Sequence, residues 1–202
     1  MAIWGHMHAY GTDSAERRVV PLLLASIAIV GALLLSRGIE RLGWEIPWWA
    51  DAPSVMSLYG LLHATFDRHV WRIGLLRRTG LIRVPDLNGS WKVRIKSSHD
   101  GKELEANITV HQTWRGMNIR LKTDQSQSSS LIASLLTSDP NEFVLSYEYL
   151  NTPGHGAVAT MHMHRGSAEI RFARDATLVS GNGEYYSGRD RANQGSLALE
   201  RM

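Results

Sequence analysis

The chain has 202 residues, enough for one domain of ordinary size and an appendage. It contains no cysteine, which excludes disulfide scaffolds and thiolate metal sites. The net charge of +3 makes it mildly basic, so the positions of its charges carry more information than their sum.

The first predicted element is a membrane span at residues 19–36, VVPLLLASIAIVGALLLS, which carries no charge. At about 1.5 Å per residue, a helix of this length spans about 27 Å, close to the thickness of a hydrocarbon core. Pro21 lies near its start, where the missing N–H of proline costs little. The run lacks the polar stripe of a buried soluble helix, and it is longer than the apolar region of a signal peptide.

A second, weaker membrane span is predicted at about residues 48–68. Its centre, APSVMSLYGLLHATF, is uncharged, and the preceding Trp48 and Trp49 suit the headgroup level. An interfacial amphipathic helix is the alternative for this segment. His63 is an ionisable group within the span and therefore a candidate functional residue, although a neutral histidine near a helix end needs no such role.

The charges around the two segments predict the orientation of the chain. Arg17 and Arg18 precede the first segment, and a basic stem follows the second, with Arg68, Arg72, Arg77, Arg78 and Arg83. Because positive residues stay on the cytoplasmic side, two spans would place both termini in the cytoplasm. A single span would instead place everything after it outside. We therefore delimit an N-terminal transmembrane region with a basic stem at residues 1–84.

From Asn88 onward, short alternating runs are separated by turn residues such as HDGK, SDPNE and NTPGHG. The predicted strands are 90–96, 104–114, 117–123, 129–137, 142–150, 157–165, 168–173, 176–186 and 196–199. The stretch SSSLIASLLTS could instead form a helix. Short strands at this spacing predict an antiparallel barrel or sandwich. We expect a small antiparallel β-barrel of about eight strands in residues 85–202.

The alternation within the strands assigns side chains to faces, and the inward set contains the candidate ligand-binding residues. Gln112, Trp114, Tyr147 and Tyr149 are predicted to point inward near strand ends. They combine stacking surfaces with hydrogen-bonding groups, which suits a nucleobase. The same residue types also line ordinary barrel cores. Arg120 offers a planar fork suited to phosphate, although the alternation points it outward.

Other polar groups give weaker signals. His162 and His164 could share a strand face in a zinc site, but the spacing fixes no third ligand, so we expect no metal. Arg189 and Arg191, in the loop SGRDR, could contact a phosphate at a barrel mouth or simply face solvent. The sequence contains no nucleophile elbow, phosphate loop or paired-carboxylate motif, so we expect no catalysis.

The order of these parts resembles a known family. Two predicted spans, a basic stem, LNGSWKVRIKS, a run of short strands, GEYYSGRD and GSLALER follow one another along the chain. This order resembles the two-transmembrane β-barrel effectors of bacterial CBASS anti-phage defence. The resemblance covers essentially the whole chain, but it provides no short motif that fixes the ligand-binding positions.

The resemblance implies a function. A CD-NTase would make a cyclic dinucleotide, the cytoplasmic barrel would bind it, and the helices would self-associate and disrupt the inner membrane. The resemblance further implies a multi-pass inner-membrane protein without enzymatic activity or cofactor. Its partners would be the cyclic dinucleotide, membrane lipids and further copies of the chain, without DNA or RNA polymers. Two alternatives stay open, a membrane-anchored lipocalin-like carrier of an apolar ligand and a non-catalytic subunit of a membrane complex.

Overall fold

The computed structural model describes residues 7–43, 47, 51–98, 101, 103–157, 161–174, 178–188 and 193–202. The chain forms two compact units. One is helical and comprises Ala15–Arg83, and the other is a β-barrel that comprises Val84–Met202 together with the described part of Met1–Ser14. The strands of the barrel unit therefore come from both sides of the helical unit in the sequence.

The helical unit begins with α1 (Glu16–Arg41) and α2 (Asp51–Arg68), followed by the short helices η2 (Val70–Arg72) and α3 (Gly74–Arg78). Within the described residues, α1 alone is long and apolar enough to cross a membrane. The first predicted span lies entirely within α1. The second corresponds to α2, whose 18 residues include several polar side chains.

Helices α1 and α2 pack against each other through small side chains of α1. The buried stripe of α1 repeats every four residues and consists of Val20, Leu24, Ala28 and Ala32. At Gly31 a Cβ atom would lie 2.9 Å from Cδ2 of Leu58, so glycine permits this close approach. The remaining surface of α1 is apolar and exposed, with Leu22, Leu23, Ile27, Ile29, Val30, Leu33, Leu34 and Leu35.

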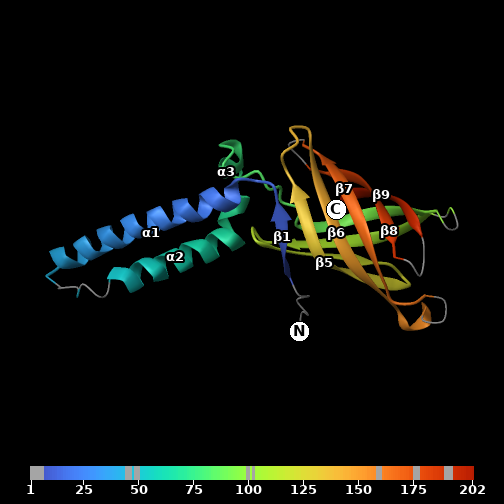
Figure 1. The fold of residues 1–202 in the computed structure, drawn as a ribbon, viewed down its shortest axis with the longest axis horizontal. Coiled ribbons are helices and arrows are strands. Elements are labelled where there is room, and N and C mark those ends of the chain that lie inside the picture. Colours follow the sequence, from blue (N-terminus) through green and yellow to red (C-terminus); the bar gives the residue numbers. More distant parts are fainter. Residues whose placement is uncertain are drawn as a thin grey trace. The chain divides into compact units, whose positions relative to one another are not determined.

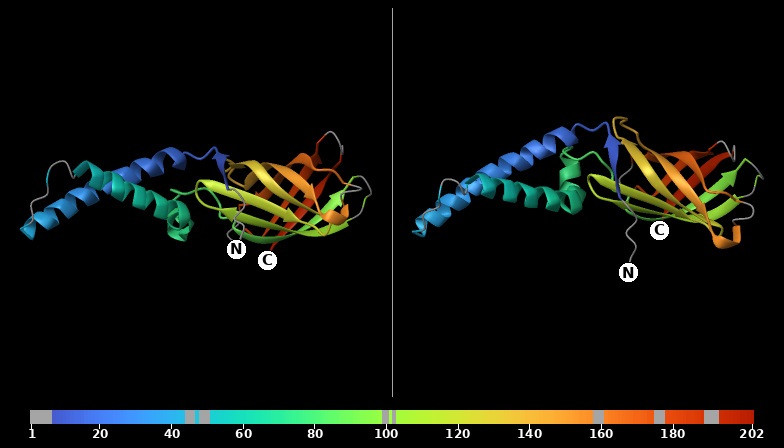
Figure 2. Two further views of the ribbon diagram at one scale, coloured as in Figure 1. Left: turned by 90° about the horizontal axis from the view of Figure 1, so that it is seen from below. Right: turned by 60° about the horizontal axis from the view of Figure 1, so that its bottom comes forward.

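The sheet of the second unit closes into a barrel of nine strands (Figures 1 and 2). The strands are β1 (His8–Thr12), β2 (Gly89–Ser97), β3 (Glu103–Gln112), β4 (Gly116–Lys122), β5 (Ser126–Leu136), β6 (Glu142–Pro153), β7 (His164–Ala173), β8 (Ser180–Ser187) and β9 (Gln194–Arg201). Neighbours around the barrel are β1-β4-β3-β2-β9-β8-β7-β6-β5. All pairs are antiparallel except β1 and β5, which run parallel. The predicted barrel architecture is confirmed, with nine strands where about eight were expected.

Three details of the predicted strands need correction. Residues 128–136 of the stretch SSSLIASLLTS lie in strand β5, so the strand prediction holds there and the helical alternative is wrong. In the described part of the predicted strand at 157–165, η3 (His155–Ala157) replaces the start, residues 161–163 are not strand, and only the last two residues belong to a strand, because β7 begins at His164. Strand β1 was not expected at all, because five residues before a membrane span give little periodic signal.

The β3–β4, β5–β6 and β7–β8 turns lie at one end of the barrel, which we call the closed end. Trp91 and Phe172 are fully buried there, with ring centroids 5.5 Å apart in an edge-to-face arrangement. The indole Nε1 of Trp91 donates to the carbonyl oxygen of Leu87 at 3.0 Å. The guanidinium of Arg201 lies 5.3 Å from the Trp91 ring centroid. Side chains therefore fill this part of the interior.

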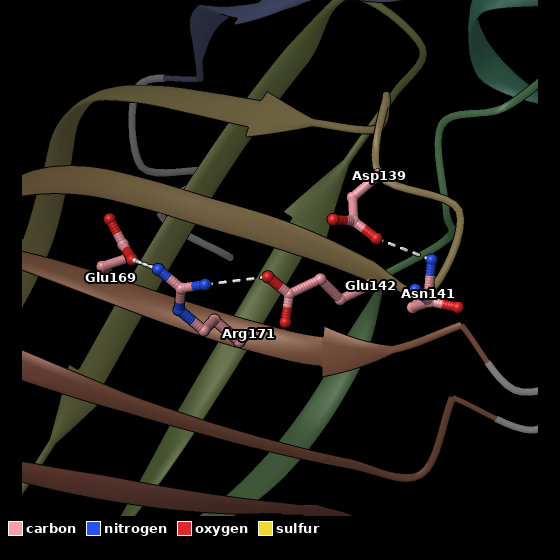
Figure 3. A network of polar contacts seen from close by, with 5 residues as sticks. All are labelled: Asp139, Asn141, Glu142, Glu169 and Arg171. Carbon is pink, nitrogen blue, oxygen red and sulfur yellow. Dashed lines mark hydrogen bonds and ion pairs between the residues drawn. The ribbon is translucent and has the colours of Figure 1, made fainter.

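On the outer face, the charged residues of β6 and β7 pair with one another (Figure 3). Arg171 contacts Glu142 at 2.8 Å and Glu169 at 2.7 Å, so one guanidinium bridges two carboxylates. Arg174 donates to the carbonyl oxygens of Thr137 and Asp139. The ion pairs of Arg171 are exposed and contribute little to stability individually. Together these contacts occupy both arginines.

Candidate ligand cavity at the open end of the barrel

A cavity of about 450 Å³ lies inside the other end of the barrel, which we call the open end. Its rim comes from the ends of hairpins: Ser97 and Glu103 flank the β2–β3 loop, Thr123–Ser126 form the β4–β5 turn, and Ser187 and Asn193 flank the β8–β9 loop. Antiparallel strands bring these turns to the same end. A volume in this range is typical of sites for small organic ligands.

The inner wall of the cavity is apolar and aromatic, with Ile95, Leu121, Tyr147, Tyr149, Ala168, Tyr185 and Leu197. The rings of Tyr147 and Tyr149 lie with centroids 6.2 Å apart, tilted by 53°. Burial is the main cause that raises the pKa of the Tyr147 hydroxyl far above its ordinary value, and electrostatic interaction with Tyr149 is the smaller cause. Tyr147 is therefore neutral at physiological pH and can donate a hydrogen bond into the cavity.

Two glycines make room for tyrosine rings of the strands beside them. Gly166 pairs with Tyr149, and a Cβ atom there would overlap the Tyr149 hydroxyl. Gly195 pairs with Tyr185, and a Cβ atom there would lie 2.5 Å from Cε1 of that ring. The rings therefore lie close against the barrel wall, and this arrangement keeps the centre of the open end empty.

Asn151 places a buried amide in the cavity wall. It lies opposite Ser128 of β5 and His164 of β7, and its side chain is almost fully buried. Its Nδ2 donates to Sδ of Met161 at 3.4 Å, and a thioether is a weak acceptor. The amide thus retains hydrogen-bonding capacity toward the cavity. In His164, Nδ1 donates to the carbonyl oxygen of His162 at 3.0 Å.

The described lining of the cavity contains carboxylates but neither lysine nor arginine. Glu103 and Asp124 lie at the rim, and the other polar groups are hydroxyls, amides and His164. A phosphate in this cavity would therefore be held by neutral donors such as Ser97, Ser128 and Asn193, rather than by an arginine of the described wall. The predicted phosphate contacts of Arg189 and Arg191 lie outside the described residues.

A second hollow, of about 520 Å³, lies on the outer side of the β4–β5 hairpin. It shares the 123–126 turn with the cavity and is lined mainly by hydroxyl, amide and aliphatic side chains together with Lys122, without an aromatic ring. Because stacking on aromatic side chains supplies much of the affinity for unpaired bases, we place the candidate site in the inner cavity.

The structure separates the five residues that the sequence grouped in one site. Tyr147 and Tyr149 line the cavity. Gln112 ends β3, whereas Glu103 at the cavity begins it, and the ten residues of this strand span about 30 Å. Trp114 lies in the β3–β4 turn, at the closed end together with Gln112.

Gln112 is a hydrogen-bonding centre of the closed end. Its Oε1 accepts from the backbone N–H of Leu87 at 2.9 Å, and its Nε2 donates to the carbonyl oxygen of Pro85 at 3.1 Å and to Tyr10 Oη at 3.3 Å. The Tyr10 hydroxyl donates in turn to the carbonyl oxygen of Trp114 at 2.9 Å. These contacts give both side chains a structural role.

Arg120 lies on β4 opposite Thr109 and Ser129, between the inward-facing Ile119 and Leu121. The alternation therefore directs it to the outer face, away from the cavity. Sequence reasoning missed Asn151 and Tyr185. Both could have been found by extending the alternation, since Asn151 continues the phase of Tyr147 and Tyr149, and Tyr185 continues that of Gly181 and Gly183.

The zinc hypothesis for His162 and His164 receives no geometric support. Among the described residues, no three histidine, cysteine, aspartate or glutamate side chains come together as a possible metal site. His164 instead forms part of the cavity wall.

An apolar helical unit and a closed barrel with an empty, partly aromatic end define the class of membrane-anchored small-ligand receptors. Comparisons with known proteins identify the family. Residues 82–201 match the family model described as Cap15, cyclic dinucleotide receptor domain, and residues 18–72 match the model described as Cap15, TM helices. The chain belongs to the Cap15 (CD-NTase-associated protein 15) family of CBASS effectors.

Two relatives illustrate the range of this similarity. The chain is 35% identical to CD-NTase-associated protein 15 of Yersinia aleksiciae over 150 residues, which cover 74% of this chain and 70% of the relative. It is 19% identical to CD-NTase-associated protein 15 of Staphylococcus schleiferi over 160 residues, 79% of this chain and 83% of that protein. The resemblance stated from the sequence is thereby confirmed at the level of the family.

Proposed function

We propose that a cyclic dinucleotide made by a CD-NTase binds in the open-end cavity and drives the membrane helices to assemble and disrupt the inner membrane, which aborts the infection. The observation that carries this proposal is the cavity of about 450 Å³ with tyrosine rings and a buried amide in its wall. It lies within the residues that match the receptor-domain model. The chain would act without a catalytic group of its own and without a cofactor.

The residues of the cavity suggest a division of roles. Tyr149 and Tyr185 present aromatic surface on which bases can stack. The Asn151 amide carries a donor and an acceptor side by side, the pattern that pairs with the polar edge of a base. Tyr147 donates from a neutral hydroxyl, and the hydroxyls and amides of the rim contact phosphates. An apolar ligand would leave the buried Asn151 amide with only its weak bond to Met161, which disfavours the lipocalin-like alternative.

The barrel also supports the proposal of two membrane spans. Strand β1 precedes α1, and β2 follows the helical unit, yet both belong to the same barrel. A folded barrel lies on one side of a membrane, so the chain between Ser14 and Val84 must cross an even number of times. With α1 as one span, α2 is the natural candidate for the second, and its 18 residues span about 27 Å. The basic stem then favours a cytoplasmic barrel and cytoplasmic termini.

The test is a titration of the full chain in detergent with cyclic di-AMP, cyclic di-GMP, cyclic di-UMP and the mixed AMP–GMP and AMP–UMP rings. We expect one or more of these to bind, and Tyr185→Ala to weaken that binding by about 5- to 150-fold through the loss of a stacking surface. Tyr186→Ala is the matched control, because Tyr186 is the next residue of the same strand and faces outward. Equal binding by both variants, or binding by neither the parent nor the variants, contradicts the proposed site.

A further inference from the structure

The N-terminal segment of the chain is a strand of the receptor barrel. Strand β1 (His8–Thr12) lies outside both matched ranges, which begin at residues 18 and 82. It lies between β4 and β5, and Figure 1 shows it next to β5. His8 and Ala9 pair antiparallel with β4, and Tyr10, Gly11 and Thr12 pair parallel with β5.

Strand β1 divides the β4–β5 hairpin into two parts. Near the turn, β4 and β5 pair directly, and the last such pair is Arg120 with Ser129. Beyond it the two strands separate and β1 fills the space between them. Ser130 marks this fork, because its hydroxyl accepts from the backbone N–H of Ile119 at 2.9 Å and contacts Nε2 of His8 at 2.7 Å. The register of β5 against β6 shifts at the same residue.

Further hydrogen bonds hold the middle of β1 and the residue that follows it. Tyr10 bonds to Gln112 and to the Trp114 carbonyl oxygen, as described above. Just after β1, the carboxylate of Asp13 accepts from the N–H groups of Thr137 and Ser138 at 2.7 and 2.9 Å, and from the Thr137 hydroxyl at 3.0 Å. Partial burial alone would raise the pKa of Asp13, but these hydrogen bonds outweigh it and lower the pKa to about 2.

The β4–β5 hairpin therefore lines the cavity and also contacts β1, the strand that precedes the first membrane helix. Its turn, residues 123–126, and Ser128 line the cavity. Ser130, two residues further along β5, is the fork that holds β1. Asp13, after β1, is three residues before Glu16, where α1 begins. A change in the separation of β4 and β5 would thus change the contacts of β1. A displacement of β1 would in turn change the anchoring of the first membrane helix.

We propose that β1 is a latch, docked between β4 and β5 in the resting receptor and released from that position when a ligand fills the cavity. The inference rests on the proposed function and describes its regulation. Because β1 occupies the space in which β4 and β5 could pair with each other, the hairpin has a second arrangement available, zipped together without β1. A ligand selects this arrangement only if it binds the released form more tightly than the docked form.

A disulfide can lock the latch, and the absence of native cysteine makes the experiment clean. A Cβ atom at Gly11 would lie 3.8 Å from Oγ of Ser134, its partner on β5, which is close enough for a disulfide. The double variant Gly11→Cys/Ser134→Cys, as full chain, is reconstituted into dye-filled vesicles of phosphatidylethanolamine and phosphatidylglycerol. The probe is whichever cyclic dinucleotide of the panel binds the parent chain.

We expect the oxidised double variant to bind this probe more weakly than the reduced one and to release no dye, and a reductant to restore both. The two single-cysteine variants should behave alike with and without oxidant. Dye release by the oxidised form equal to that of the reduced form would overturn the latch. Failure of the two cysteines to pair would also overturn it, since the docked strand holds them together. If no panel member binds the parent, the proposed function fails first.

A loosened latch gives an independent readout. Asp13→Ala removes the three hydrogen bonds after β1, and the loss of even one hydrogen bond to a charged group corresponds to a change of at least about tenfold in the docking equilibrium. We expect the probe concentration for half-maximal dye release to fall by at least about tenfold. Asp139→Ala is the control, because that carboxylate caps its own turn at the N–H of Asn141 (Figure 3). An unchanged or higher probe requirement in Asp13→Ala contradicts the latch.

Discussion

Replacing Gln112 by methionine tests whether this residue holds the closed end together or binds the ligand. Methionine has a similar volume but bonds to neither backbone partner of the glutamine. The N–H of Leu87 and the carbonyl oxygen of Pro85, both buried, would lose their hydrogen bonds to this side chain. A buried polar group without a partner costs about 1–3 kcal/mol, so the two together should lower the free energy of unfolding by roughly 2–6 kcal/mol.

This loss translates into a measurable change in melting temperature. The barrel unit comprises about 130 residues. At about 2.1 cal/mol/K per residue its entropy of unfolding is about 0.28 kcal/mol/K, so Tm should fall by roughly 7–20 °C. The assay is calorimetry of the full chain in detergent, followed by ligand titration well below the lowered Tm. Ligand affinity should be unchanged, because Gln112 lies at the opposite end of β3 from the cavity.

Asn107→Met is the matched control, since Asn107 is exposed on the same strand and receives the same replacement. An exposed substitution of this kind changes stability by no more than about 0.5 kcal/mol, or roughly 2 °C in Tm. The reasoning is refuted if Gln112→Met melts like the parent but no longer binds. That outcome would move the ligand to the closed end and restore the grouping of Gln112 and Trp114 with the ligand.

Three further outcomes are expected. A reporter fused after Met202 should be active in the cytoplasm and silent in the periplasm, and the reverse pattern would contradict the cytoplasmic location of the barrel. Gly195→Ala should lower stability by about 1–3 kcal/mol through overpacking against the Lys96 carbonyl oxygen and the Tyr185 ring, whereas the exposed Ser196→Ala should not, as measured by Tm. The lowered pKa of Asp13 stabilises the fold above about pH 4, and this contribution is lost as pH falls toward 2, so the parent should lose more Tm over that range than Asp13→Asn.

The sequence could predict the barrel because the information for single strands is local. A period of two residues marks each strand and its inward face, so Tyr147 and Tyr149 were assigned to the inside correctly. Alternation does not give depth along the barrel, however. β3 and β6 lie an odd number of strands apart in the chain and run in opposite directions, so Gln112 near the end of one and Tyr149 near the end of the other lie at opposite ends.

The parts that the sequence did not reveal depend on contacts between distant segments. Gln112 is bonded to Leu87, 25 residues away, and to Tyr10, 102 residues away. No local pattern connects a glutamine at a strand end to a tyrosine that precedes both helices in the sequence. The cavity depends likewise on glycines of one strand facing tyrosines of the next, which becomes visible only when the register of the pairs is known.

Because β1 is a strand of the barrel, the receptor unit includes residues that precede the membrane helices in the sequence. A fragment cut at residue 85 keeps the cavity-lining residues but loses β1, which fills the space between β4 and β5. In such a fragment β4 and β5 could pair along their whole length, as in the released form, and Ser130, Thr137 and Gln112 would lose their partners from residues 8–13. The resting barrel therefore includes a strand that the chain supplies from before the membrane helices. If the ligand binds in the open-end cavity as proposed, ligand binding and membrane anchoring share the β4–β5 hairpin and β1, and that is the physical basis for expecting them to be coupled.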